Sequence, residues 1–188
     1  MLNGAAWVRE RYGDATLTRV IAACSPAVRE RLATGNALHW HPVTELDEFL
    51  NALDRLVGRG DGKIAEAAGA AAARVNLGRM GVRVAFFLGR PEFLMRRVAG
   101  VWRQYNDAGE MRVLEFANGR MLTELAETRS PSWAFCASIT GWLLEAALSA
   151  GLKGSTAAHV ECRARAGARC LWSIRRASGD RVKADPRA

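Results

Sequence analysis

Three cysteines and one histidine in the last third of the chain could together bind a metal ion. Cys136 belongs to a long apolar segment, and His159, Cys162 and Cys170 follow shortly after it. Three thiolates and one imidazole are a complete ligand set for a tetrahedral zinc ion. A ligand set with no open position is typical of a structural site, because it leaves no place for a catalytic water.

The spacing of the last three residues constrains this interpretation. Strands over 155–164 and 169–176 would form a hairpin with Cys162 directly opposite Cys170, and facing Cβ atoms lie about 4.5–5.5 Å apart. His159 precedes Cys162 by three positions, so the two point to opposite faces of a regular strand. Both can bind one ion only if the strand contains a bulge or a twist, or if the histidine lies at its frayed start.

Other interpretations of these residues remain open. Glu161 is an alternative to the histidine as the fourth ligand. A cysteine such as Cys136 on an apolar helical face is also typical of a core residue, and Cys162 and Cys170 could be a facing thiol pair or a redox disulfide. Cys24 lies on another apolar stripe and is expected in the core. A reducing compartment favours thiols or a bound metal over structural disulfides, so a zinc ion stays one of the open interpretations of these residues.

Helices followed by short strands are expected to position these ligands. Apolar residues at helical spacing predict helices over 14–33 (with a break at Ser25 and Pro26), 43–58, 63–79, 91–105 and 131–150. Alternating residues predict strands over 111–116 and 120–125, joined by a turn at Asn118 and Gly119. Residues 81–89 are either a strand or a buried helical piece. This order predicts an α+β fold, with N-terminal helices packed on a small antiparallel sheet and a long helix before a C-terminal β-hairpin.

A single domain over residues 1–176 is the expected organisation, with a helical half over 1–109, a zinc-hairpin half over 110–176 and a disordered tail over 177–188. No apolar run reaches about 18–20 residues, and charges occur early at the N-terminus, so neither a membrane span nor a secretory signal is expected. The predicted localisation is therefore cytoplasmic. The net charge of +8 comes from dispersed arginines without a continuous basic face, which argues against specific nucleic-acid binding.

The segment 136–174 resembles the 4-vinyl-reductase-like domain family in the order of its features. The family pattern corresponds here to Cys136, Gly141-Trp142, Gly151, His159-x-x-Cys162, Gly167 and Cys170-Leu171-Trp172. In sensory members, which resemble aromatic-responsive regulators of bacterial transcription, the cysteines and a glutamate bind a structural zinc. This chain has His159 at the glutamate position, and because histidine is also a good zinc ligand, the resemblance implies that the site is kept.

The whole chain is also similar to a family that occurs in large paralogous sets in myxobacteria, and the wider fold is shared with haem-based nitric-oxide sensors and Golgi-transport subunits. A haem sensor of that kind needs an axial histidine on a helix and a Tyr-x-Ser-x-Arg anchor. His39 and His41 precede Pro42 rather than lying within a long helix, and the sequence has no such anchor. Haem is therefore not expected, and these two histidines are expected to be structural or exposed.

The resemblance implies an apolar pocket between the N-terminal helices and the sheet. Its expected walls are the aromatic residues Phe86, Phe87, Phe93, Trp102, Tyr105, Phe116 and Trp133. Aromatic walls with few polar anchors suit a hydrophobic or aromatic ligand. Each of these residues could equally belong to an ordinary core.

The expected function is small-molecule sensing or protein interaction, supported by a structural zinc. A signal would pass to a separate signalling protein, through a homodimer or an exposed helix. An enzyme is not expected, because the sequence has no nicotinamide fingerprint, nucleophile–base pair or paired carboxylates. The alternatives are a ligand-free structural scaffold and, by the family's name, a reductase acting on a vinyl-bearing tetrapyrrole.

Overall fold

The α+β class is confirmed by a computed structural model, which describes residues 1–35, 42–79, 98–105, 109–127 and 131–176. The described helices are α1 (Leu2–Tyr12), α2 (Asp14–Ala22), α3 (Pro26–Thr34), α4 (Val43–Leu56), α5 (Lys63–Arg79), α8 (Val98–Tyr105), α9 (Trp133–Ser149) and the 3₁₀ turn η1 (Arg163–Arg165). The described strands are β1 (Glu110–Ala117), β2 (Arg120–Ala126), β3 (Thr156–Glu161) and β4 (Cys170–Arg175).

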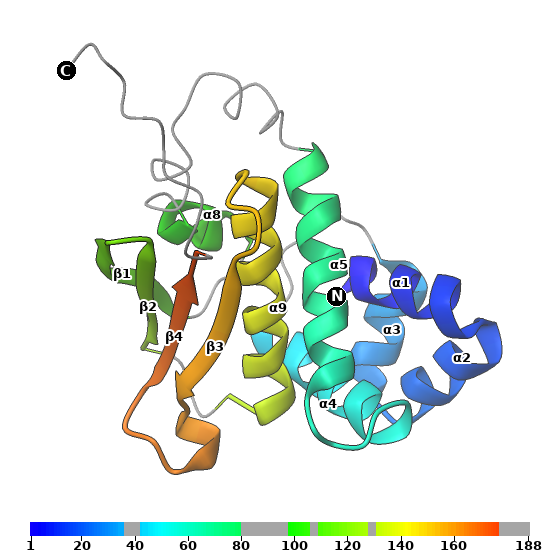
Figure 1. Ribbon diagram of the computed structural model, residues 1–188. Helices are drawn as coiled ribbons and strands as arrows, with labels where there is room; N and C mark the ends of the chain where they lie inside the picture. The colour runs from blue at the N-terminus through cyan, green and yellow to red at the C-terminus, as the bar shows by residue number, and fades with distance from the viewer. Residues whose placement is uncertain (36–41, 80–97, 106–108, 128–130, 177–188) are drawn as a thin grey trace.

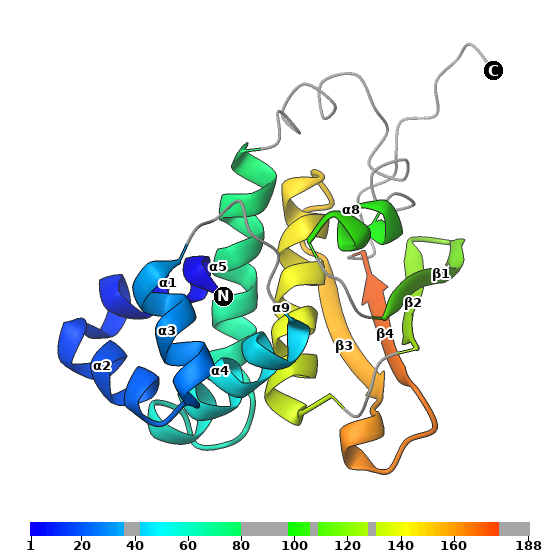
Figure 2. The same ribbon diagram turned by 180° about the vertical axis from the view of Figure 1, so that it is seen from behind.

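The long helix α9 lies between the sheet and the N-terminal helices (Figures 1 and 2). It packs on β3 and β4 on one side and on α4 and α5 on the other. Most of its residues are buried, including consecutive ones from Ala134 to Gly141. A helix that is apolar on all sides is typical of such an internal position. α9 therefore joins the helical half of the chain to the sheet.

Two glycines allow α5 and α9 to pack with their backbones in contact. A Cβ atom placed on Gly69 would lie 1.9 Å from the carbonyl oxygen of Ser138. A Cβ atom on Gly141 would likewise lie 1.9 Å from the carbonyl oxygen of Glu66. Any side chain at either position would therefore push the two helices apart.

The four strands form one antiparallel sheet in the order β1-β2-β4-β3. β1 and β2 are joined by the predicted turn, in which Asn118 (φ 52°) and Gly119 (φ 70°) are both left-handed. Two positive φ values are required by the type I′ turn that suits a two-residue hairpin. β3 and β4 form the predicted C-terminal hairpin, and its connection contains η1.

The element boundaries largely follow the predictions. The break at Ser25 and Pro26 separates α2 from α3, where the Ser25 hydroxyl accepts a hydrogen bond from the amide of Val28 at 3.5 Å. The strand predicted over 155–164 ends at Glu161, because the chain turns into η1 after Cys162. Helix α1 was not predicted, because its buried residues are mostly small.

Several predictions concern residues outside the described ranges: the segment 81–89, the start of the helix expected at Pro91, the tail 177–188, and the two histidines before Pro42. Within the described parts of the chain, no helix is long and apolar enough to cross a membrane.

Candidate metal centre

The structure brings the four predicted ligands together from three separate segments. Cys136 lies in the first turn of α9, His159 lies on β3, Cys162 precedes η1, and Cys170 begins β4. One nitrogen of the histidine and the three Sγ atoms all lie within 4.8 Å of one another. This group of four side chains is referred to below as the Cys3His cluster.

The geometry of the Cys3His cluster suits a tetrahedral metal ion. The Sγ atoms of Cys136 and Cys170 are 3.7 Å apart, which is close to the edge of about 3.8 Å that Zn–S bonds of about 2.3 Å give in a tetrahedron. All of the cysteines are unpaired thiols. The three cysteines are buried, since Cys136 and Cys170 have no exposed surface and Cys162 retains 6%.

A β-bulge in β3 explains how His159 and Cys162 can point to the same face of the strand. His159 pairs with Trp172 and Glu161 pairs with Leu171, so Val160 is an extra residue without a partner on β4. Because the bulge removes one residue from the alternation, His159 and Cys162 point to the same face although they are three apart. The bulge was one of the three solutions considered from the sequence.

The thiols perturb one another's ionisation. The hydrogen bond between Cys136 and Cys170, followed by burial, raises the pKa of the Cys136 thiol. The same hydrogen bond lowers the pKa of Cys170 to about 4, and the neighbouring His159 ring and the backbone amide of Arg163 act in the same direction. One thiolate is therefore favoured at neutral pH before any metal binds, and the thiolate is the form that binds metal.

The histidine ring is positioned by stacking, and one of its nitrogens lies near the three thiols. Its imidazole stacks on the indole of Trp172 (centroids 4.4 Å apart, planes 5° apart) and on that of Trp133 (5.6 Å, 10°). Among the described residues, neither ring nitrogen of His159 has a hydrogen-bond partner, and both nitrogens are buried. Buried polar atoms are normally paired, so a metal ion would supply the missing partner of the nitrogen that faces the thiols.

The two other candidates named from the sequence have different roles. Glu161 accepts hydrogen bonds from the backbone amides of Ala168 and Arg169 and from the Arg169 side chain, which occupies its carboxylate in the hairpin loop. Cys24 is buried in the core, as expected, and its thiol donates a hydrogen bond to the carbonyl of Val20 at 3.3 Å. Neither residue belongs to the Cys3His cluster.

The structure describes the side chains of three predicted pocket residues, which are Trp133, Trp102 and Phe116. Trp133 stacks on His159 beside the metal cluster. Trp102 is buried against Phe135, and its indole N–H donates to the carbonyl of Gly109 at 3.2 Å. Phe116 lines a described hollow. Phe86, Phe87, Phe93 and the side chain of Tyr105 lie outside the described residues.

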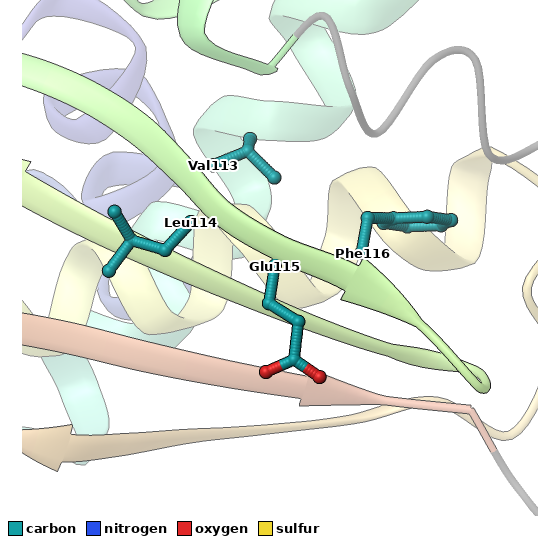
Figure 3. A pocket seen from close by; sticks show the side chains of 4 residues that line it. All are labelled: Val113, Leu114, Glu115 and Phe116. Carbon is teal, nitrogen blue, oxygen red and sulfur yellow. The ribbon is translucent and has the colours of Figure 1, made fainter.

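That hollow has a volume of about 310 Å³ and opens at the surface of β1. Figure 3 shows its described lining, with Val113 and Phe116 on one side of the strand and Leu114 and Glu115 on the other. Its volume is at the lower end of the range for ligand pockets. Its lining contains a carboxylate as well as apolar groups.

Three contributors to the metal centre were not predicted: Trp172, Arg165 and Thr140. The indole N–H of Trp172 donates to the Thr140 hydroxyl at 2.9 Å, and that hydroxyl donates to the carbonyl of Cys136 at 3.2 Å. The Cζ atom of Arg165 lies 3.4 Å from the ring centroid of Trp133. The sequence does contain a signal for the two tryptophans that stack on His159. Trp172 follows Cys170 by two residues and so shares its strand face, and Trp133 precedes Cys136 by about one helical turn.

No protein-family model and no curated protein matches the chain. Its fold is similar to that of solved H-NOX proteins. A mutant H-NOX domain from Shewanella oneidensis in the Fe(II)CO ligation state aligns with a TM-score of 0.70 and 14% identity, over 95% of this chain and 96% of that one. A mutant Fe(II) unliganded H-NOX protein from K. algicida aligns with a TM-score of 0.68 and 12% identity, over 94% of each chain. This chain therefore has the H-NOX fold.

Haem is named with solved H-NOX proteins, and its iron is held by an axial residue such as a histidine, a cysteine or a tyrosine. His159 is the one histidine in the described ranges, and its ring is stacked on two indoles with a nitrogen among three thiols. His39 and His41 lie outside those ranges.

Proposed function

We propose that this chain is a small-molecule-sensing domain in which a structural zinc ion holds the C-terminal hairpin against α9. The ligands are Cys136, His159, Cys162 and Cys170. The observation that carries the assignment is the pair of buried, unpartnered nitrogens of His159 beside three buried thiols. Three soft sulfur ligands and one imidazole favour zinc, and four protein ligands leave no open position for chemistry.

The resemblance to sensory 4-vinyl-reductase-like domains supports the same assignment, because their metal ligands correspond to these four positions. The backbone also favours bound thiolates. Burial raises the pKa of the Cys162 thiol, and the backbone amide of Ala164 opposes this shift. The start of η1 therefore supplies N–H dipoles to the sulfur atoms that would carry the negative charge of the site.

Metal analysis of tag-free protein purified without added metal tests the zinc site. We expect about one zinc per chain and no haem absorption, because four buried ligands form one closed site. Cys170→Ser should lose the metal and much of the thermal stability, since structural zinc binding contributes directly to folding. Cys24→Ser is the matched control and should keep both, because this thiol lies outside the cluster. Wild-type protein without zinc would refute the proposal.

The sensing role is supported by the H-NOX fold and by the hollow beside Phe116 on β1. A hydrophobic or aromatic compound is the proposed ligand class, because the lining contains Val113, Leu114 and Phe116 beside the carboxylate of Glu115. A closed zinc site argues against an enzyme, and the signal would pass to a separate protein. The second candidate is a ligand-free scaffold, which the densely filled layer around α9 favours.

Native mass spectrometry distinguishes these two functions. A sensor is expected to retain a small molecule, or to gain thermal stability with apolar aromatic compounds, because a ligand that binds only the folded state raises its stability. Phe116→Asp should abolish that gain, whereas Leu148→Asp on the exposed end of α9 should not. Zinc as the single bound species, with no stabilisation by any compound, would favour the scaffold.

A further inference from the structure

Four side chains around the Cys3His cluster form a continuous stacked series. The series runs from Trp172 to His159, from His159 to Trp133, and from Trp133 to Arg165. Exposure increases along it: Trp172 is completely buried, His159 and Trp133 are partly exposed, and Arg165 is exposed. Trp133 and Arg165, which we call the lid, are therefore the outer end of the series.

Each segment that carries a ligand also supplies one member of this series. On α9, Trp133 lies three residues before Cys136, which places both on the same helical face. On β4, Trp172 lies two residues after Cys170 and so shares its strand face. In the hairpin loop, η1 brings Arg165 one 3₁₀ turn beyond Cys162. The ligands and the stack are thus fixed by the same three segments.

The lid covers the ligand that a departing metal ion would release first. Cys136 and Cys170 are completely buried and Cys162 nearly so, whereas His159 is partly exposed. Imidazole is also the neutral ligand of the set, so its bond to a cation is easier to break than that of a thiolate. To leave the metal, the imidazole must slide off both indoles.

Trp133 is held in place from the helical half as well. A Cβ atom on Gly62, in the turn before α5, would lie 2.7 Å from the Nε1 atom of Trp133. The amide of Gly62 is in turn fixed by the buried carboxylate of Asp54, at 3.0 and 3.2 Å from its two oxygens. The indole is therefore wedged between the α4–α5 turn, His159 and Arg165.

We propose that Trp133 and Arg165 are positioning residues that hold His159 on the metal ion and so control how fast the ion is released. This inference rests on the proposed zinc site and adds its regulation. Aromatic stacking keeps the imidazole in its bound orientation, and the Arg165 guanidinium keeps the outer indole in place by a cation–π contact. A change at the lid would alter metal exchange without removing any ligand.

Zinc transfer to a chromophoric chelator, measured on the full zinc-loaded chain, tests this role. Residues that orient metal ligands typically contribute about 10–100-fold to metal affinity, and we expect Trp133→Leu to release zinc faster by the same factor. Arg165→Ala should accelerate release about 2–5-fold, as expected for loss of one exposed cation–π contact. Arg165→Lys, which keeps the charge but not the planar stack, should lie between Arg165→Ala and wild type.

Trp142→Leu is the matched control. It is also a partly exposed tryptophan on α9, but it packs against Ala73, Leu77 and Ala146. Its release rate should equal that of wild type. Absorption of the cobalt-substituted proteins supplies a second readout, because weaker histidine ligation changes the cobalt bands in the lid variants and not in the control.

The outcomes separate the two proposals. Wild-type protein that contains no zinc overturns the metal site itself. Wild-type release rates in zinc-loaded Trp133→Leu and Arg165→Ala overturn the role of the lid while leaving the site intact, and so does equal acceleration by Trp142→Leu. Arg165 is exposed, so Arg165→Ala decides the question even if Trp133→Leu does not fold.

Discussion

The imidazole of His159 lies directly opposite the indole of Trp172 on the neighbouring strand, with ring centroids 4.4 Å apart. This pairing exists because Val160 bulges out of β3 and leaves the histidine in register with Trp172. The same bulge turns His159 toward Cys162 and Cys170. One inserted residue thus determines both the fourth ligand and the ring on which it stacks.

Deletion of Val160 should preserve the metal site. The deletion would leave His159 and Cys162 two positions apart, and residues two apart share a face of a regular strand. Val160 is 52% exposed, so its removal leaves no cavity. We expect metal analysis of the deletion variant to give the same zinc content as wild type.

The complementary change is the insertion of one alanine after Val160. If the one-residue bulge persists, the histidine turns to the opposite face. If the strand becomes regular, the histidine keeps the face but lies two residues farther along the strand from the cysteines. Zinc content should fall in this variant, although all four ligand residues are present. Loss of zinc in the deletion variant, with full zinc in the insertion variant, would mean that the bulge does not orient His159.

Thr140→Val should destabilise the protein through Trp172. The Thr140 hydroxyl is the acceptor for the buried indole N–H, at 2.9 Å. Valine has the same shape but accepts no hydrogen bond, and an unsatisfied buried donor costs about 1–3 kcal/mol. Urea unfolding of the zinc-loaded protein measures this loss, with Thr140→Ser as the variant that keeps the hydroxyl. A valine variant as stable as wild type would contradict the proposed importance of this hydrogen bond.

Gly141→Ala should be among the most destabilising single substitutions in α9. The new methyl group would lie 1.9 Å from the carbonyl oxygen of Glu66. This clash can be relieved only by moving the backbone of α5 or α9, and both helices are packed. Overpacking of this kind costs about 1–3 kcal/mol or more. Gly100→Ala in α8 is the control: nothing lies within 4 Å of its new Cβ, so it should be neutral or stabilising by up to about 1 kcal/mol. Thermal melting of both variants gives the comparison.

The fold could be predicted where local signals were strong. The amphipathic pattern of 43–58 matches α4 (Val43–Leu56), and the Asn118-Gly119 turn defines the hairpin of β1 and β2. Helix α1 could not be predicted, because the residues that it buries are Gly4, Ala5 and Val8. Small side chains give almost no apolar periodicity, and such a helix is stabilised by its tertiary contacts.

The cluster of metal ligands could be predicted because it depends on residue type and hairpin register. Cys162 and Cys170 are symmetrical about Ala166, and the observed pairing of Glu161 with Leu171 has the same centre. The bulge and the stacked series could not be derived, since both depend on how β3, β4 and α9 pack in three dimensions. His159 was the least certain ligand for this reason, and its burial among thiols became visible only in the folded chain.

The buried carboxylate of Asp54 should make stability depend on pH. This side chain is 3% exposed, and burial raises its pKa above the usual value of 3.8, with a smaller contribution from the charge of Asp61. Between the ordinary pKa and the raised one, the folded state binds more protons than the unfolded state, so the contribution of this group to stability decreases as pH rises through that window.

The variant Asp54→Asn tests this expectation, because asparagine cannot ionise and its contribution to stability does not change with pH. Wild type should therefore gain stability relative to Asp54→Asn as pH falls from neutral toward the ordinary carboxyl value of 3.8, measured as the difference between urea unfolding free energies at each pH. Groups that titrate elsewhere affect both proteins and cancel in the difference. A difference that stays constant, or that shrinks on acidification, would show that the carboxylate is not held in an unfavourable environment.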